Sequence, residues 1–153
     1  MKIVSGGQTG ADRAALDWAI EHGIEHGGWC PEGRLAEDGV IPAHYQVVEL
    51  AGAGYRARTK ANVRDSDATL IISIEPVLTT GSKHTQLFAQ AFGKPCQHIY
   101  PAMDWRHAIE AWLDSNAIQV LNIAGPRASS EPEISSFTTE VLEFTLQLYL
   151  HNL

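Results

Sequence analysis

Residues 2–16 read KIVSGGQTGADRAAL, a short apolar run followed by a glycine-rich loop and an alanine-rich segment. The apolar run predicts a β-strand, and the pattern from Asp12 to Glu21 predicts a helix. Glycines at such a junction allow positive φ angles and leave no side chain to obstruct an anion. The first turn of the helix beyond them offers free N–H groups. The stretch therefore predicts a strand–loop–helix unit that can hold an anionic group.

The same alternation of apolar runs and helical patterns continues along almost the whole chain. The predicted strands are residues 2–6, 27–31, 45–50, 68–74, 96–100 and 118–125. The predicted helices are residues 12–21, 55–67, 83–92, 105–113 and 133–150, and residues 31–42 are expected to be irregular. Strands separated by helices of this length form right-handed βαβ crossovers. We therefore predict a single Rossmann-like α/β domain over residues 1–153, with a doubly wound parallel sheet.

Composition limits the classes of partner. The chain has 153 residues, of which 44% are hydrophobic and 19% charged, as in ordinary globular proteins. Its net charge of -7 argues against nucleic acid as a partner, because binding to phosphate backbones favours a basic face. Apolar runs stay below the roughly 18 residues of a membrane span, and the N-terminal residues lack a signal-peptide pattern. Cys30 and Cys96 have no CxxC spacing, which favours reduced thiols in a cytoplasmic protein.

Glycine-containing loops follow three of the predicted strands. In doubly wound sheets ligands bind at the carboxyl ends of the strands, where these loops would meet. Each loop carries small hydroxyl residues and a basic residue; one such loop alone is equally well explained as a simple strand–helix connection. Together they predict a site for a phosphate-bearing ligand. The candidate residues are Gly6, Gly7, Gln8, Thr9, Gly10, Ala11, Asp12 and Arg13; Thr80, Gly81, Ser82 and Thr85; and Gly125, Pro126, Arg127 and Ser129.

Several common site types are excluded by spacing. The segment GGQTG lacks the GxGxxG spacing of dinucleotide-binding loops, and GGQTGADR lacks the GK[ST] ending of a Walker A loop. Ser5 does not stand in a GxSxG context, so a triad nucleophile is not expected. Cysteine and histidine residues show no zinc spacing, and we expect no metal ligated by the protein.

Two further segments contribute candidates. Arg58, Thr59 and Asn62 share one face of a polar helix, either as a solvated face or as hydrogen-bonding groups for a ligand. Arg34 and Asp38 lie in a proline-bounded loop, which is either a surface excursion or part of the site. In the second case Arg34 would clamp an anion, and Asp38 would accept a hydrogen bond from a ring N–H.

Five blocks of the sequence resemble the successive motifs of the molybdenum carrier (molybdenum cofactor carrier) family. The blocks are SGGQTGADRAALDWA, GWCPEGRLAEDGVIP, YRARTKANVRDSDATLII, TTGSKHT and LNIAGPRAS, and they cover most of the chain. The resemblance extends to the Rossmann-like cytokinin-activating phosphoribohydrolases, also called lysine-decarboxylase-like proteins. LNIAGPRAS is similar to the segment that opens those enzymes, which implies a circular permutation.

The resemblance implies a carrier or store of the molybdenum cofactor more than an enzyme. The hydrolases have a G-G-x-G-T-x-x-E motif where this chain has TTGSKHTQ, with Gln86 and no carboxylate. Gln86 can form hydrogen bonds but cannot act as a general base, and no catalytic residues are expected. The bound ligand would be the cofactor, a phosphorylated pterin whose dithiolene holds molybdenum, and apo-molybdoenzymes would receive it. Metal-free pterin, a nucleotide and molybdate stay open as ligands.

Two alternatives use the same scaffold. A nucleoside-monophosphate phosphoribohydrolase would need Asp12 as its acid, although Asp12 is also placed to cap a helix. A binding module that senses a nucleotide-like ligand would instead regulate a partner. The apolar residues of segment 133–150 leave little polar face, so this helix is expected to be deeply buried or to form the interface of a homo-oligomer.

Overall fold

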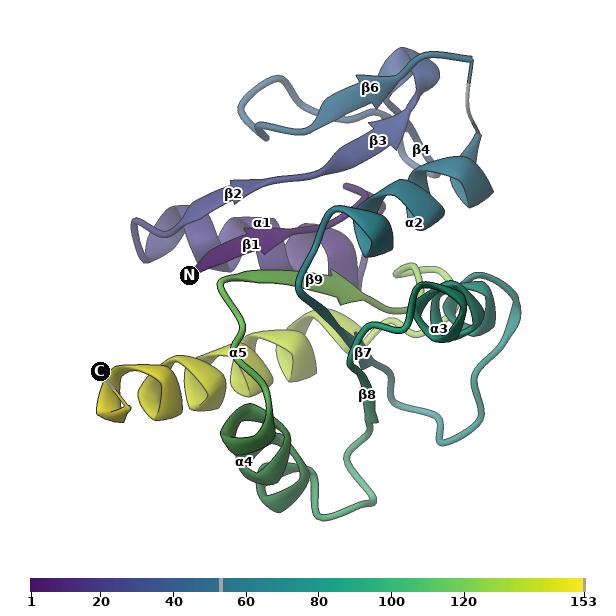
Figure 1. Ribbon diagram of the computed structural model, residues 1–153. Helices are drawn as coiled ribbons and strands as arrows, with labels where there is room; N and C mark the ends of the chain where they lie inside the picture. Colours follow the sequence, from purple (N-terminus) through teal and green to yellow (C-terminus); the bar gives the residue numbers. More distant parts are fainter. Residues whose placement is uncertain (53, 153) are drawn as a thin grey trace.

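A five-stranded parallel sheet forms the centre of the protein (Figure 1). The computed structural model describes residues 1–52 and 54–152. The strands are β1 (Lys2–Val4), β2 (Glu25–Gly27), β7 (Ala68–Ile72), β8 (Cys96–Ile99) and β9 (Val120–Ala124), in the order β2-β1-β9-β7-β8. All five residues of β7 are buried, which is why this strand reads as an unbroken apolar and β-branched run.

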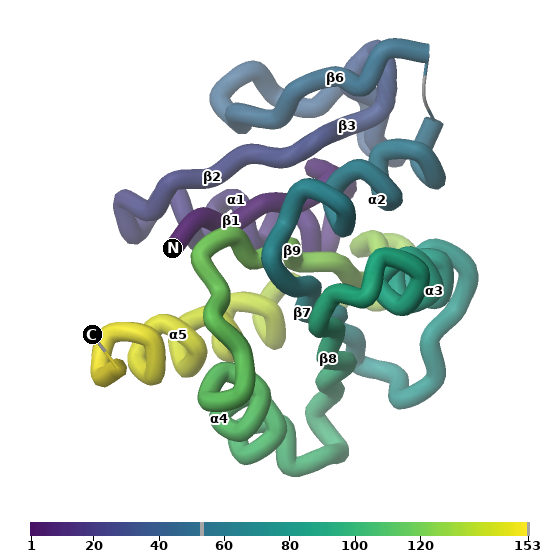
Figure 2. Tube along the Cα trace, viewed as in Figure 1, coloured from purple at the N-terminus to yellow at the C-terminus, as the bar shows by residue number. Residues whose placement is uncertain are grey.

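Helices cover both faces of the sheet, as Figures 1 and 2 show. They are α1 (Ala11–Glu21), α2 (Tyr55–Arg64), α3 (Thr80–Phe92), α4 (Trp105–Ser115) and α5 (Ile134–His151). The helices α1, α4 and α5 pack on one side of the sheet, and α2 and α3 pack together on the other. The predicted α/β class with a doubly wound parallel sheet is confirmed.

The helix α5 buries one face in the core. Ile134, Phe137, Val141 and Leu142 are buried there, and the ring of Trp105 meets Phe137 edge-on at 5.6 Å between centroids. Leu150 in its last turn is exposed, so the burial expected for this helix is partial and the homo-oligomer stays a prediction. The far end of α5 returns to the start of the chain, where the Met1 amino group donates to Tyr149 Oη at 3.4 Å.

Two small sheets extend the structure beyond the central one. The strands β3 (Trp29–Pro31) and β6 (Val48–Leu50) form a parallel pair. The strands β4 (Leu35–Ala36) and β5 (Gly39–Val40) form a hairpin, preceded by a 3-10 turn (Glu32–Arg34). Glu37 and Asp38 are the two turn residues of this hairpin. The irregular segment predicted over 31–42 therefore contains ordered structure.

Most of the predicted element bounds differ from the structure at one end or the other, and three of the differences have a clear physical cause. The strand β2 was not predicted, because its sequence Glu-His-Gly has no apolar pattern; backbone pairing of Lys2 with Glu25 creates it. The helix α3 begins at Thr80, not at residue 83, because the Thr79 carbonyl already accepts from Ser82 N and Lys83 N. The helix α2 ends at Arg64, where the backbone N–H of Asp65 returns to Ala61. In the described residues, none of the helices is long and apolar enough to cross a membrane.

Glycine permits close packing at two places in the loops after β1 and β9. Gly10 has a φ of 83°, and a Cβ on it would overlap the carbonyl oxygen of Pro126. A Cβ on Gly125 would overlap the carbonyl oxygen of Ile72 and the side chain of Ala11. The end of β7, the loop after β9 and the start of α1 are therefore packed together at a distance that only glycine allows.

We expect Gly125→Ala to lower the free energy of unfolding by about 2 kcal/mol or more, because backbone on one side and a helix on the other leave no room for the methyl group. Gly81→Ala is the control: it lies in α3, and a Cβ there would meet nothing within 4 Å. That change should shift stability by about 1 kcal/mol or less. Urea unfolding measures both, and equal effects of the two variants would contradict the packing described.

Candidate functional site

A cleft with a volume of about 590 Å³ lies where the carboxyl end of β9 meets the N-termini of α1, α2 and α3. Its size is within the usual range for small-molecule sites. All three predicted glycine loops contribute to it. The sequence-predicted residues that line it are Gln8, Asp12, Arg58, Thr59, Thr80, Gly81, Ser82, Thr85, Gly125, Pro126, Arg127 and Ser129.

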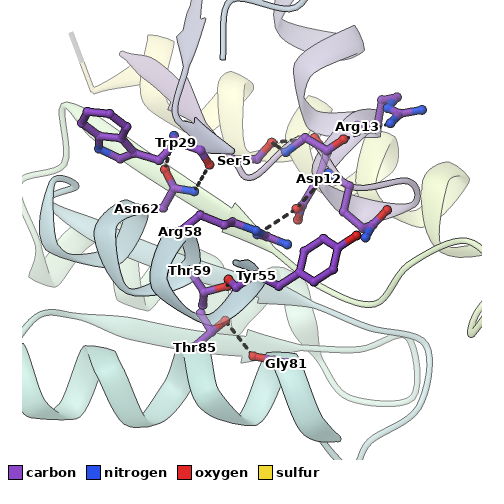
Figure 3. A network of polar contacts seen from close by, with 12 residues as sticks. Ser5, Asp12, Arg13, Trp29, Tyr55, Arg58, Thr59, Asn62, Gly81 and Thr85 are labelled. Atoms are coloured by element: carbon purple, nitrogen blue, oxygen red, sulfur yellow. Dashed lines mark hydrogen bonds and ion pairs between the residues drawn. The ribbon is translucent and has the colours of Figure 1, made fainter. Parts of the chain in front are cut away.

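The buried base of the cleft is an ion pair between α1 and α2 (Figure 3). Arg58 Nη1 lies 3.3 Å from Asp12 Oδ2, and the Gln8 N–H donates to the same oxygen at 3.4 Å. The Asp12 side chain is 4% exposed and that of Arg58 14%. Burial raises the pKa of Asp12 above its ordinary value, and the positive charge of Arg58 opposes this effect.

Asp12 does not occupy the N-cap position of α1. Gly10 stands there, and the Asp12 carboxylate accepts from the N–H of Gln8 in the preceding loop. The Ser5 hydroxyl donates to the backbone carbonyl of Asp12 at 2.9 Å. The Asp12 carboxylate therefore fixes the glycine loop and orients Arg58. It does not cap the helix, as the sequence had suggested it could.

Two buried donors at the cleft have no partner among the described residues: Gln8 Nε2 and Arg58 Nε. Gln8 Oε1 accepts from Thr9 N at 3.1 Å and from Glu37 N at 2.8 Å, which fixes the orientation of the amide and makes Nε2 the free end. A buried donor without an acceptor costs about 1–3 kcal/mol. An acceptor atom from a bound molecule would remove this penalty.

The opposite wall of the cleft is the start of α3. Thr79 is its N-cap, and in the described chain no side chain caps the helix. The Thr85 hydroxyl already donates to the carbonyl of Gly81 at 3.0 Å, so the donors that this wall offers in the described chain include backbone N–H groups of the first turn and the hydroxyls of Thr79, Thr80 and Ser82. The guanidinium groups of Arg58 and Arg127 each lie 5.9 Å from the Tyr55 ring centre. This wall therefore combines a helix N-terminus with positive charge.

Arg34 and Asp38 do not line the cleft. The Arg34 guanidinium donates to the carbonyl oxygens of Ile41, Pro42, Tyr45 and Val47 at 2.8–3.1 Å, which holds the loop between β5 and β6. Asp38 forms a bidentate ion pair with Arg13, whose Nη2 also donates to the Gly7 carbonyl. These contacts give Arg34, Asp38 and Arg13 structural partners in place of the predicted ligand.

Other predicted residues shape the cleft from behind. Asn62 accepts from Trp29 N at 2.7 Å and donates to Trp29 O at 2.9 Å, so it joins α2 to β3. A Cβ on Gly6 would overlap the Arg58 guanidinium, and one on Gly7 would meet Ile41. Gly10 and Ala11 form the backbone contact with the loop after β9 described above. Thr59 does line the cleft, although its hydroxyl already donates to the carbonyl of Tyr55 in its own helix.

Glu37 is a residue of the site that sequence reasoning did not select. Its carboxylate accepts hydrogen bonds from the hydroxyl of Thr9, from Ser129 N at 3.1 Å and from Ser129 Oγ at 2.5 Å. The Ser129 and Thr9 hydroxyls lower the pKa of Glu37, so it is ionised at neutral pH. Its only signal in the sequence is its place in the acidic pair before Gly39. In the described residues, no group of three or more His, Cys, Asp or Glu side chains could hold a metal ion.

We expect Arg34→Lys to lower the free energy of unfolding by about 1–3 kcal/mol, because a lysine cannot reach four carbonyl oxygens with one planar group. Arg64→Lys is the control, since the Arg64 side chain forms an exposed ion pair with Asp65, and this change should alter stability by about 0.5 kcal/mol or less. Urea unfolding measures both variants. Unchanged stability of Arg34→Lys would contradict the structural role.

The raised pKa of Asp12 predicts a pH-dependent stability difference. The folded protein binds the proton of the Asp12 carboxyl group more tightly than the unfolded chain does. Protonated Asp12 therefore adds to the free energy of unfolding below the ordinary pKa of 3.8, and this gain is lost as the pH rises through the raised pKa of the folded protein. The free energy of unfolding of wild type, relative to Asp12→Asn, should therefore fall over that range. Urea unfolding from about pH 4 to about pH 7 measures the difference, and a constant difference would contradict the assignment.

Comparison with known proteins agrees with the fold and with the order of the motifs. Residues 3–146 match the circularly permutated YpsA SLOG family. A solved structure, "Putative molybdenum carrier protein" from Syntrophus aciditrophicus SB, is 52% identical to this chain, with a TM-score of 0.90 over 95% of this chain and 94% of the other. None of the curated proteins matches the sequence. The resemblance and the circular permutation inferred from the motifs are confirmed, and the chain belongs to the circularly permutated YpsA SLOG family.

Proposed function

We propose that this protein binds the molybdenum cofactor in the 590 Å³ cleft and carries or stores it. The observation that carries the proposal is the pair of buried donors without a partner in the described chain, Gln8 Nε2 and Arg58 Nε. Such donors favour a ligand rich in acceptor oxygens. A relative that is 52% identical bears the name of a molybdenum carrier, which supports the choice of ligand.

The chemistry of the lining fits a phosphorylated ring compound. The start of α3, with Arg127 beside it, suits a terminal phosphate. Asp12 lines the cleft and can accept a hydrogen bond from a ring N–H, which is the role that the sequence predicted for Asp38. The cofactor's own dithiolene holds molybdenum, so the protein needs to supply hydrogen bonds and charge around the cargo. The positive charges of Arg56, Arg58 and Arg127 in the cleft suit the negative charge of the cofactor.

Binding without turnover is favoured by the residues at the start of α3. Thr85 is 3% exposed and bonded to Gly81, and Gln86 follows it in place of a carboxylate. An amide cannot take a proton from water at neutral pH. Among the described residues, the wall that would approach the scissile bond in a hydrolase therefore has donors and the imidazole of His84, but no carboxylate.

Arg58→Ala should weaken cofactor binding by about tenfold to a hundredfold, because it removes a charge-assisted donor from the base of the cleft. Arg64→Ala, on the same helix but paired with Asp65 outside the cleft, is the matched control and should bind like wild type. Fluorescence titration with the isolated cofactor measures affinity, and reconstitution of an apo-molybdoenzyme measures transfer. Absence of saturable binding by wild type, or equal loss in both variants, would refute the proposal.

A phosphoribohydrolase activity is the second candidate, and the environment of Asp12 is what favours it. A buried carboxylate with a raised pKa beside an arginine is typical of catalytic acids and bases. Incubation with nucleoside monophosphates, followed by chromatography of the released base, tests this candidate. Base release by wild type that is lost in Asp12→Asn would establish an enzyme; no release by either protein leaves the carrier.

A further inference from the structure

Glu37 occupies a set of donors that would suit an oxyanion. One backbone N–H and two hydroxyl groups converge on its carboxylate, from Thr9 in the loop after β1 and from Ser129 in the loop after β9. Arg127 Nε lies 4.0 Å away. Backbone N–H groups, hydroxyls and a guanidinium converging on one point are the contacts that phosphate groups receive in proteins. The carboxylate of Glu37 therefore stands where a ligand oxyanion could be bound.

These donors adjoin the proposed ligand cleft. Ser129, Arg127 and Gln8 all line it, and the Gln8 amide accepts from the backbone N–H of Glu37. Gln8 is only 6% exposed, and its Nε2 is the donor without a partner in the described residues. An oxyanion at the Thr9 and Ser129 donors would thus be continuous with the cleft and close to a group that needs an acceptor.

The Glu37 side chain can leave these donors when an incoming oxyanion replaces the hydrogen bonds that it gives up. It is 21% exposed and belongs to the two-residue turn of the β4–β5 hairpin. The adjacent Asp38 is held separately by Arg13, so the hairpin keeps one anchor if Glu37 turns outward. Leu35 and Val40 of the hairpin are 52% and 67% exposed, so these two apolar side chains do not rely on the Glu37 contact for burial.

We propose that the donors of Thr9 and Ser129 form a second oxyanion subsite, which Glu37 fills in the free protein and yields to a ligand with two anionic groups, such as a diphosphate. The inference rests on the proposed function, because it extends the same cleft. A ligand with one phosphate would bind at the start of α3 and leave Glu37 in place. A diphosphate would bring a second anionic group, which would replace the carboxylate at the Thr9 and Ser129 donors.

The subsite predicts that one substitution affects the binding of two probes differently. Glu37→Gln removes the competing charge, so the affinity for pyrophosphate should rise about tenfold while that for orthophosphate changes little. Glu49→Gln is the matched control, because Glu49 also accepts a backbone N–H, from Gly33, but lies outside the cleft. Isothermal titration of the full chain measures the affinities, and thermal unfolding verifies that each variant is folded.

Amide NMR separates the two anion positions. The Ala128 N–H donates to Thr9 Oγ1 at 3.1 Å and so reports on the same position as Ser129. In wild type and in Glu37→Gln, pyrophosphate should shift the amide signals of Ala128 and Ser129 as well as those of Gly81 and Ser82. Unshifted Ala128 and Ser129 signals, or pyrophosphate affinity in folded Glu37→Gln that is equal to or below wild type, would overturn the subsite and leave Glu37 as a structural link. Orthophosphate that fails to shift Gly81 and Ser82 would refute the phosphate position of the proposed function instead, whatever Ser129 shows.

Discussion

The contact between the loops after β1 and β9 is the constraint on which the site depends. Gly10 and Gly125 bring backbone against backbone, and the N–H of Ala11 donates to the Pro126 carbonyl at 3.3 Å. Because the two strands are neighbours in the sheet, this contact fixes the start of α1 beside the segment that carries Arg127 and Ser129. A side chain at either glycine would separate the two loops, and the cleft would lose its shared wall.

Charge is distributed so that most cations near the site already have a partner. Arg13 is paired with Asp38, Arg34 with carbonyl oxygens, and Arg58 with Asp12. The chain carries a net charge of -7, yet the cleft has more cationic than anionic side chains. The attraction for an anion is therefore local, and the acidic exterior opposes nonspecific association with polyanions. Such a separation suits a protein that must hold one small anionic molecule selectively.

The sequence predicted the elements whose own pattern determines them and missed those that depend on distant partners. The strand β7 and the helix α4 were readable because their apolar residues repeat with the period of the element. The strand β2 was not, because it exists through pairing with β1. The three glycine loops were recognised and do meet, but glycine content could not separate Gly10, which serves packing, from Gly81, which lines the cleft. Arg34 was predicted as an anion ligand, because the sequence around it does not indicate that its guanidinium donates to four backbone carbonyls of a later loop.

The hydrogen bond between the Met1 amino group and Tyr149 has a consequence for connectivity. The start of the chain and the end of α5 lie on the same side of the molecule in Figure 1, so a short linker could join them without crossing the sheet. A new opening in the turn before β9, near residues 116–118, would then place the LNIAGPRAS segment first. The spatial order of the strands would be unchanged. Genetic rearrangement of this kind alters the order of synthesis and leaves the finished cleft the same, which explains how a permuted chain can keep its ligand site.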